Sequence, residues 1–275
     1  MQDDLIFDLG MHRGEDTDFY LKKGYRVVGI EADPELAEHC RRRFATRIAD
    51  GTLRIFEGAI VARERAGQGA ITFYKNPGMS VWGTVDPRWR DRNAGFGQPS
   101  REIQVQCLDL AAILRDCGVP LYMKIDIEGA DRLCLEYLKD CAERPRYLSI
   151  EDEKVDFAKL LQDIETLCAL GYRHFRAVQQ QTIPNSIHHG SDRGGRPVMH
   201  RFEEDASGVF GPDFLTAWMT RDELLVEYKW IYEMYRIFGD ASPFARDPNL
   251  ATLRMQLERH FQRPLPGWHD THAAL

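Results

Sequence analysis

Residues 7–17 read FDLGMHRGEDT and connect the first expected strand to the first expected helix. The apolar residues 5–7 suit a buried strand, and residues 14–23 suit a helix that ends before a glycine. Gly10 and Gly14 let the backbone turn tightly and come close to a ligand. The stretch therefore predicts the first strand–loop–helix unit of an α/β fold, with a ligand at the loop.

An acidic residue follows where a nucleoside ligand would need one. Residues 25–30 are expected to form the second strand, and Glu31 ends it in a position to accept hydrogen bonds from both ribose hydroxyls. The glycines follow a G-x-x-x-G pattern, which differs from the G-x-G-x-x-G pattern that cradles a pyrophosphate. Together these features predict an adenosine-type cofactor without phosphates. The alternative is that the glycines only serve a tight turn and that Glu31 is a solvated surface carboxylate.

The first part of the chain alternates apolar runs with amphipathic segments, which is typical of a mostly parallel sheet. A helix is expected to begin at Asp33, with an apolar stripe at Leu36, Cys40, Phe44 and Ile48. We predict a Rossmann-like α/β fold, in which a mostly parallel twisted sheet is flanked by helices. Further strands are expected at 53–56, 70–74, 102–106, 121–127 and 147–150, a helix at 155–170 and an edge strand at 172–178.

A domain boundary is expected near residue 180. Residues 1–180 are predicted to form the cofactor-binding domain, and residues 181–275 a long loop followed by a helical C-terminal extension. Residues 181–212 are rich in Gly, Pro, His, Ser and Arg, which favours a loop that could serve as an active-site lid. Aromatic residues in the helices expected at 221–238 and 249–261 indicate packing onto the body or onto another subunit, so a homodimer is a candidate assembly.

Composition narrows the classes of function. A net charge of -7 and a pI near 5.7 provide no general basic field for nucleic acid. Six cysteines are scattered without a C-x-x-C pair, so reduced thiols are expected. The sequence shows no signal-peptide pattern and no apolar run of membrane-spanning length, so we expect a cytoplasmic protein without a membrane span.

Three stretches carry a resemblance to a known family. Residues 6–10 (IFDLG) with Gly14, residues 28–34 (VGIEADP) and residues 123–131 (MKIDIEGAD) resemble, in that order, three motifs of the FkbM family of class I methyltransferases. These are its first cofactor motif, its acidic second motif and its Lys-Ile-Asp-hydrophobic-Glu-Gly-Ala-Glu signature. The chain departs from the family at His12-Arg13, where Asn and a small or apolar residue are common. It departs again at Cys107, where Thr is usual.

The resemblance implies an S-adenosylmethionine-dependent methyltransferase. It places Asp8, Gly10 and Gly14 around the methionine part of the cofactor, and Glu31 at the ribose. It also places Gly58 and Ala59 near the adenine. Asp126, at the end of a further expected strand, is expected to contact the cofactor as well. The implied reaction is O-methylation of a hydroxyl on a sugar, a glycan or a secondary metabolite.

Carboxylates are expected near the transferred methyl group. Asp126, Glu128, Glu151 and Asp152 follow expected strands and should emerge at the edge that carries the glycine loop. Asp126 is our first candidate for the base that takes the hydroxyl proton. The structural alternatives are that Asp126 caps a helix and that Glu128 makes the turn into it. A further hypothesis is that Asp126, Glu151 and Asp152 bind Mg²⁺, which prefers hard oxygen ligands and could orient a substrate diol.

His12 is the second candidate catalytic residue. A neutral imidazole is an available base, and the glycine loop would bring this one close to the cofactor, although a solvent-facing side chain explains it equally well. His188-His189 in the expected long loop could contact the substrate, although a flexible polar loop explains these residues equally well. Trp82 and Trp89 belong to an expected substrate-side region, or are ordinary packing aromatics.

Three other functions compete with this hypothesis. A nucleotide-linked oxidoreductase would also use Glu31, but the G-x-G-x-x-G pattern is missing. A methyltransferase of amino groups or bases typically carries an Asn/Asp-Pro-Pro-aromatic run where residues 126–129 here read DIEG. A non-catalytic binding or assembly subunit would use the C-terminal helices as its interface, but the intact glycine loop and Glu31 argue against it.

Overall fold

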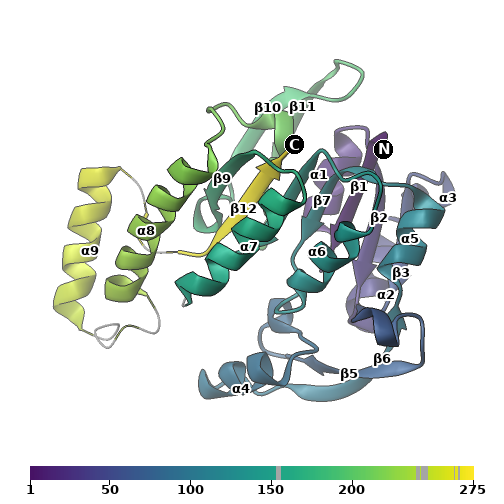
Figure 1. The fold of residues 1–275 in the computed structure, drawn as a ribbon, viewed down its shortest axis with the longest axis horizontal. Helices are drawn as coiled ribbons and strands as arrows, with labels where there is room; N and C mark the ends of the chain where they lie inside the picture. Colours follow the sequence, from purple (N-terminus) through teal and green to yellow (C-terminus); the bar gives the residue numbers. More distant parts are fainter. Residues whose placement is uncertain (153–155, 240–241, 243–246, 263, 266) are drawn as a thin grey trace.

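A seven-stranded sheet forms the centre of the protein (Figure 1). The computed structural model describes residues 1–152, 156–239, 242, 247–262, 264–265 and 267–275. The strands of the sheet are β1 (Gln2–Leu9), β2 (Arg26–Glu31), β3 (Leu53–Glu57), β7 (Pro120–Ile125), β8 (Tyr147–Glu151), β9 (His174–Gln179) and β12 (His269–Ala274). Their order is β3-β2-β1-β7-β8-β12-β9, and β12 runs in the direction opposite to the other six strands. The predicted Rossmann-like fold with a mostly parallel sheet is confirmed.

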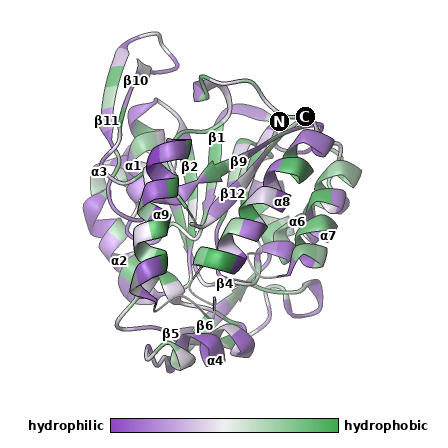
Figure 2. Ribbon diagram, turned by 90° about the vertical axis from the view of Figure 1, so that its left-hand side faces the viewer, coloured by the Kyte–Doolittle hydropathy of each residue, from purple (hydrophilic) through white to green (hydrophobic). Residues whose placement is uncertain are grey.

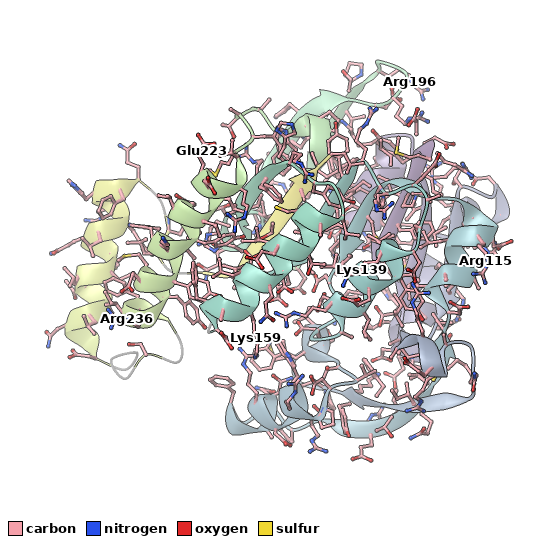
Figure 3. The ribbon with its side chains drawn as sticks, in the orientation of Figure 1. Arg115, Lys139, Lys159, Arg196, Glu223 and Arg236 are labelled. Carbon is pink, nitrogen blue, oxygen red and sulfur yellow. The ribbon has the colours of Figure 1, made fainter. Side chains whose placement is uncertain are left out.

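Helices cover both faces of this sheet. One face is covered by α5 (Leu110–Cys117), α6 (Asp131–Lys139), α7 (Phe157–Ala169) and α8 (Arg221–Phe238), and the other by α1 (Glu15–Lys22), α2 (Pro34–Arg43) and residues 202–210. Alternate residues of β1 serve the two faces, with Phe7 in the first core and Ile6 in the second. Figure 2 shows hydrophobic colouring along β1 in the interior. Charged side chains such as Arg115 and Lys139 lie at the periphery (Figure 3).

The start of α2 agrees with the sequence, but its predicted apolar stripe ends early. The Asp33 carboxylate accepts a hydrogen bond from the Glu35 amide at 2.9 Å and so caps the helix. Phe44 leaves the helical conformation, and α3 (Ala45–Ala49) then starts in a new direction. Ile48 is consequently 37% exposed, and its expected place in the stripe is wrong.

A small second sheet lies outside the main one. β5 (Ala70–Lys75) and β6 (Arg101–Leu108) pair antiparallel where strands were predicted, and β4 (Ala59–Ile60) joins β6 in parallel. The helix α4 (Pro87–Gly95) lies between β5 and β6 in sequence, and Figure 2 colours it mostly hydrophilic. This unit forms one end of the molecule in Figure 1 and brings residues 79–92 toward the main sheet.

The predicted long loop at 181–212 is wrong in its centre. β10 (Ile187–Ser191) and β11 (Pro197–Arg201) form a hairpin in which Ile187 pairs with Arg201. Exposed and more buried residues alternate along both strands, although glycine is abundant at the turn. The helices α8 and α9 (Pro248–Phe261) agree with the expected helices at 221–238 and 249–261.

The final residues contain a strand that the sequence did not predict. β12 lies between β8 and β9, so the main sheet crosses the boundary expected near residue 180. Residues 181–275 are therefore more than a loop with a helical extension. The sequence HDTHAA has few of the β-branched and aromatic residues that mark strands, and pairing on both sides provides what local propensity lacks.

The six cysteines all carry free thiols, as predicted. None of the described helices combines the length and the apolar character needed to cross a membrane.

Candidate active site

A cavity of about 370 Å³ opens at the carboxyl ends of β1, β2 and β7. Such an edge is where open α/β sheets bind their ligands. The wall brings together the glycine loop, the end of β2, the β3–β4 connection and the segment after β7. Of the predicted site residues, it includes Gly10, His12, Glu31, Gly58, Ala59, Asp126 and Glu151.

Gly10 and Gly14 of the first loop are needed for different structural reasons. Gly10 has a φ of +81°, and a Cβ there would lie 1.8 Å from the backbone oxygen of Asp126. Gly14 has a φ of +85°, and a Cβ there would lie 2.3 Å from the ring of Phe44. Gly10 thus lets the loop cross directly beside Asp126 on the cavity wall. Gly14 is not on that wall and makes room for core packing, so its predicted contact with the cofactor is not supported.

Asp8 also lies beneath the cavity. Its side chain is fully buried, and the Thr17 hydroxyl donates a hydrogen bond to it at 2.6 Å. Burial raises the pKa of Asp8 to about 6, although the nearby ammonium of Lys124 opposes the increase. Asp8 is not among the cavity-wall residues, so it supports the glycine loop from below.

Lys124 is a buried cation that the sequence analysis did not assign a role. Its ammonium lies 3.6 Å from Asp8, 3.3 Å from Asp16 and 3.4 Å from Asp126. Burial lowers the pKa of Lys124, but these three carboxylates raise it well above its usual value. The one signal in the sequence was a lysine inside the apolar run of residues 121–127.

The segment after β11 closes the cavity beside this charge network. The Ser207 amide donates hydrogen bonds to both carboxylate oxygens of Asp16, at 2.9 and 3.1 Å. Asp205, Ala206 and Ser207 belong to the cavity wall. The C-terminal third of the chain therefore contributes to the site, as the expected lid would have done.

Glu31 occupies the predicted position at the end of β2. Its two carboxylate oxygens accept hydrogen bonds from the amides of His12 and Asp33, both at 2.8 Å. It is 7% exposed, and burial raises its pKa to about 7. Each oxygen has a second lone pair available for a ligand hydroxyl.

The β3–β4 connection forms an apolar part of the wall. Gly58 has a φ of +144°, and a Cβ there would lie 2.6 Å from the backbone oxygen of Gln106. Its amide donates a hydrogen bond to the backbone oxygen of Glu31 at 2.9 Å. Ala59, Ile60 and Leu36 line the same part of the cavity and offer a surface for a flat apolar group.

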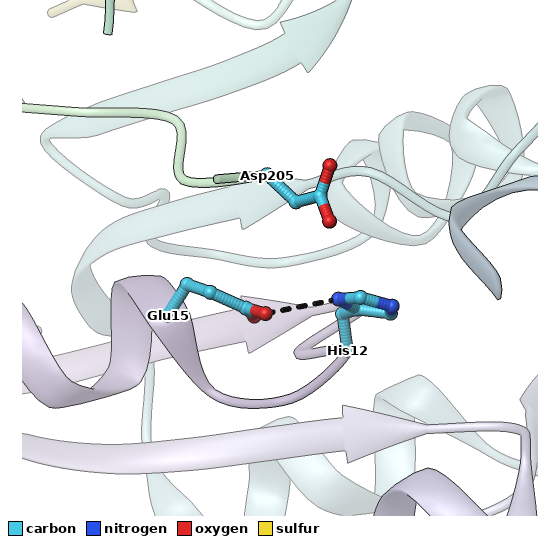
Figure 4. Close-up of side chains that lie close together, drawn as sticks. All are labelled: His12, Glu15 and Asp205. Atoms are coloured by element: carbon cyan, nitrogen blue, oxygen red, sulfur yellow. Dashed lines mark hydrogen bonds and ion pairs between the residues drawn. The ribbon is translucent and has the colours of Figure 1, made fainter. Parts of the chain in front are cut away.

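His12 lies between two partners. Its Nδ1 is 3.2 Å from Glu15 Oε1, and its Nε2 is 2.8 Å from the hydroxyl of Ser80. Burial lowers the pKa of His12, but the hydrogen bond and charge of Glu15 outweigh it, so the net shift is upward. Figure 4 shows His12 pointing toward Glu15, with Asp205 nearby. Because both ring nitrogens are engaged, its predicted role as a base stays a prediction.

Asp126 stands at the end of β7, and the carboxylates around it differ from the predicted set. Ligand oxygens of Asp126, Glu128 and Glu151 all lie within 4.8 Å of one another. Asp126 does not cap the next helix, since the N-cap of α6 is Ala130 and no side chain caps it. The loop between Asp126 and α6 is held by Asp131, which accepts the amides of Ile127 and Gly129, both at 3.0 Å. Burial raises the pKa of Asp131 to about 7.

The predicted role of Asp152 as a metal ligand is wrong. Its carboxylate accepts hydrogen bonds from the hydroxyls of Tyr228 and Thr271 and is 8% exposed. Successive residues of a strand point to opposite faces, so Asp152 faces α8 while Glu151 faces the cavity. Asp270 on β12 lies on the cavity wall instead, and the sequence could not indicate it because the strand itself was missed.

Aromatic side chains form the remaining wall. Those of described residues are Phe73, Trp82, Trp89, Tyr235, Phe238 and Trp268. Trp82 and Trp89 line this wall, where their role toward a substrate stays a prediction. Both also pack, Trp82 against Phe96 and Trp89 beside Gly129. His188-His189 lies on the hairpin away from this wall.

A comparison with known families decides the class of the protein. The Methyltransferase FkbM domain matches residues 8–174. The chain belongs to the FkbM methyltransferase family. The motifs at residues 6–10, 28–34 and 123–131 therefore carry a true family relationship. The oxidoreductase hypothesis loses its support.

Individual relatives of this FkbM protein are distant. Residues of the chain are 39% identical over 57 positions to a probable ribosomal RNA small subunit methyltransferase A of Methanospirillum hungatei JF-1, covering 21% of this chain and 22% of that protein. The solved FkbM methyltransferase of Methylobacillus flagellatus KT is 18% identical, with a TM-score of 0.39, over 64% of this chain and 40% of that one. A methyltransferase of Thiobacillus denitrificans, solved with S-adenosyl-L-homocysteine, is 14% identical, with a TM-score of 0.34, over 99% of this chain and 86% of that one.

The FkbM match does not cover the whole cavity. The matched residues 8–174 contain the glycine loop, Glu31 and Asp126. Ser207, Trp268 and Asp270 lie on the cavity wall beyond the match. The chain's own C-terminal part therefore builds one side of the site.

Proposed function

We propose that this FkbM protein transfers a methyl group from S-adenosylmethionine to a hydroxyl group of a sugar, a glycan or a secondary metabolite. The observation that carries the proposal is the carboxylate of Glu31, which stands on the cavity wall beside the backbone of the glycine loop. A carboxylate at this position can accept hydrogen bonds from both hydroxyls of a ribose. Family membership and this nucleoside-type site together support the methyl donor.

The cavity wall offers a partner for each part of the donor. Ala59 and Leu36 provide an apolar border for the adenine, and the loop at Gly10 leads toward the methionine end. Bound S-adenosylmethionine supplies a methyl group on a positively charged sulfonium. Carboxylates of Glu15, Glu31 and Asp126 face the same cavity and favour a cationic ligand.

Asp126 is the proposed base for the acceptor. It lies where β7 ends, and 36% of its side chain is exposed, so an acceptor hydroxyl can reach it. The carboxylate takes the hydroxyl proton as the oxygen bonds to the methyl carbon. Trp82, Trp89 and Trp268 restrict water and offer flat surfaces against which a sugar or another ring can pack.

The fold disfavours a dinucleotide. Rossmann dinucleotide domains have the strand order 3-2-1-4-5-6, whereas here the antiparallel β12 lies between β8 and β9. The G-x-x-x-G loop also lacks a pyrophosphate cradle. The cytoplasmic location, the homodimer and the use of Mg²⁺ stay predictions, and Asp152 is removed from the proposed Mg²⁺ ligands.

Transfer of a labelled methyl group tests the reaction class. The protein is incubated with S-adenosylmethionine carrying a ¹³C-methyl group and with paired acceptors that differ only in hydroxyl against amine. We expect O-methyl signals in the NMR spectrum of the products, reduced at least roughly a hundredfold in rate by Asp126→Asn. Asp140→Asn, a surface carboxylate that pairs with Arg63, is the control. N-methyl products alone would contradict the hydroxyl proposal.

A further inference from the structure

Ser80 lies on a part of the cavity wall that the proposed donor site does not use. It begins the 3-10 turn η2 (Ser80–Trp82) in the connection between β5 and α4, and its chain neighbours on both sides also line the cavity. The proposed donor contacts Gly10 and Glu31 come from the ends of strands in the main sheet. Ser80 therefore belongs to the wall that is left for the acceptor.

The hydroxyl of Ser80 is held by the ring of His12. Its oxygen lies 2.8 Å from His12 Nε2, and Nδ1 of the same ring lies 3.2 Å from Glu15 Oε1, the contact drawn in Figure 4. The side chains of His12 and Glu15 are 13% and 6% exposed, so little water competes with these contacts. The Arg13 amide donates to the other Glu15 oxygen at 3.1 Å. A chain of contacts thus runs from a fixed carboxylate through the imidazole to the Ser80 hydroxyl.

The direction of these hydrogen bonds follows from the charge of Glu15. Burial raises the pKa of Glu15, but the hydrogen bond and charge of His12 outweigh it, so the net shift is downward. An ionised carboxylate only accepts hydrogen bonds, so His12 Nδ1 must carry a proton. A neutral imidazole has no further proton, which leaves Nε2 to accept the hydrogen bond of the Ser80 hydroxyl. Ser80 then presents only lone pairs to the cavity.

Carboxylates from three elements surround the His12 ring. Glu15 lies on α1, Glu31 ends β2, and Asp205 follows β11. Burial lowers the pKa of His12, but the hydrogen bond and charge of Glu15, followed by the charges of Glu31 and Asp205, raise it above its ordinary value. Below this pKa, Nε2 also carries a proton and donates to Ser80, whose own proton can turn toward the cavity. The hydrogen-bonding character of Ser80 therefore changes with the charge of His12.

We infer that Ser80 binds the acceptor through its lone pairs, and that His12 is a positioning residue that holds the Ser80 hydroxyl in this orientation. The inference rests on the proposed function, in which Asp126 takes the proton of the hydroxyl that is methylated. That hydroxyl has no second proton to donate, so Ser80 accepts a hydrogen bond from another group of the acceptor. The inferred acceptor class therefore carries a second hydroxyl, as a sugar does, and a simple alcohol lacks this contact.

Nitrogen NMR of the full chain tests the direction of the hydrogen bonds without a substrate. Histidine is labelled with ¹⁵N, and His12→Asn identifies the signals of His12. Asn suits this position because His12 has a φ of +50°, which Asn also tolerates. Above the pKa of His12, we expect a protonated Nδ1 and an unprotonated Nε2. The opposite tautomer would overturn the inference.

Two model acceptors that differ in one hydrogen-bond donor test the contact itself. Cyclohexane-1,2-diol has two hydroxyls, whereas the second oxygen of 2-methoxycyclohexanol carries a methyl group and keeps only its lone pairs. In methyl-transfer assays with S-adenosylmethionine, the KM of the diol should lie at least about tenfold below that of the methoxy compound. Ser80→Ala should bring the two KM values within about twofold of each other, while the kcat ratio changes little. The wild-type KM ratio should shrink likewise as the pH falls through the pKa of His12.

Ser186→Ala is the matched control. The Ser186 hydroxyl donates to the Ile183 backbone oxygen at 2.6 Å, and Ser186 is not among the cavity-wall residues. Its variant should keep the wild-type KM ratio within about twofold. Equal KM ratios in the wild type and Ser80→Ala would overturn the assignment of Ser80.

Calorimetry with S-adenosylmethionine separates this inference from the proposed function. Ser80→Ala should keep the donor affinity within about twofold of the wild type. A donor affinity that falls about tenfold in Ser80→Ala, with an unchanged KM ratio, would assign the hydroxyl to the donor and overturn the inference alone. Turnover of neither model acceptor by a protein that binds the donor would overturn the inferred acceptor class. Absence of donor binding in the wild type overturns the proposed function itself.

Discussion

Gly10 is the residue on which the geometry of the site most directly depends. Alanine there would meet the Asp126 backbone oxygen at 1.8 Å and would keep a φ of +81°. We expect Gly10→Ala to lower the free energy of unfolding by about 2 to 5 kcal/mol, from backbone strain and steric overlap together. Urea unfolding measures this.

Gly51→Ala is the matched control for this prediction. Gly51 has a φ of +77°, but nothing lies within 4 Å of a Cβ built there. The free energy of unfolding of Gly51→Ala should therefore fall only by the cost of backbone strain, about 1 to 2 kcal/mol. Equal losses in the two variants would show that the close approach to Asp126 is unimportant.

Glu31 should make stability depend on pH. Its pKa is about 7 in the folded protein against an ordinary 4.5, because burial disfavours the charged form. The stability that follows from a raised pKa is present below about 4.5 and is lost as the pH rises through about 7. Relative to Glu31→Gln, the wild type should lose up to roughly 3 kcal/mol of unfolding free energy across this window. Parallel pH profiles for the two proteins, measured by thermal and urea unfolding, would refute the assignment.

At the residue scale, the sequence predicted the positions that depend on local order along the chain. The cavity wall includes Gly10, Glu31, Gly58, Ala59 and Asp126, because each lies at the carboxyl end of a parallel strand of the main sheet or within two residues after it. Asp8 and Gly14 belong to the same motif as Gly10, yet neither residue lies on the cavity wall. Asp8 contacts Thr17 and Gly14 lies against the ring of Phe44. The order of residues along the chain does not reveal these contacts.

At the scale of elements, α8 is tied to the sheet by a buried acid. The Tyr228 hydroxyl donates to Asp152, which also accepts from Thr271 of β12. Tyr228→Phe should lower the free energy of unfolding by about 1 to 3 kcal/mol, because it leaves a buried carboxyl oxygen without its donor. Thermal unfolding and urea titration measure the loss.

Tyr172→Phe is the comparison at this scale. The Tyr172 hydroxyl donates to the uncharged backbone oxygen of Pro145 at 2.9 Å in an equally buried place. Its loss should be smaller, about 0.5 to 1.5 kcal/mol. A larger effect at Tyr172 than at Tyr228 would mean that Asp152 does not depend on α8.

Elements with strong local patterns were predictable from the sequence, and those held by distant partners were not. The apolar strands and the Asp33-capped α2 carry their signals within a few residues. β12 consists of residues with weak strand propensity and is stabilised by β8 and β9 on both sides. Because the sequence did not predict β12, it also did not predict that Asp270 of this strand lines the cavity.

At the scale of the whole molecule, the cavity joins two parts of the chain. The family segment at residues 8–174 supplies Gly10, Glu31 and Asp126, where we propose that the methyl donor binds, and residues beyond it supply Ser207, Trp268 and Asp270. The sheet itself crosses between these parts through β12. We therefore expect donor binding to require the whole chain rather than the family segment alone.

Isothermal titration with S-adenosylmethionine tests whether the cavity binds the methyl donor through Glu31. The wild-type protein should bind S-adenosylmethionine and S-adenosylhomocysteine in the micromolar range and should not bind NADH. Glu31→Ala should weaken donor binding by roughly ten- to a hundredfold, because hydrogen bonds to a charged group are lost. Unchanged affinity in Glu31→Ala, or binding of NADH in place of the methyl donor, would contradict the account.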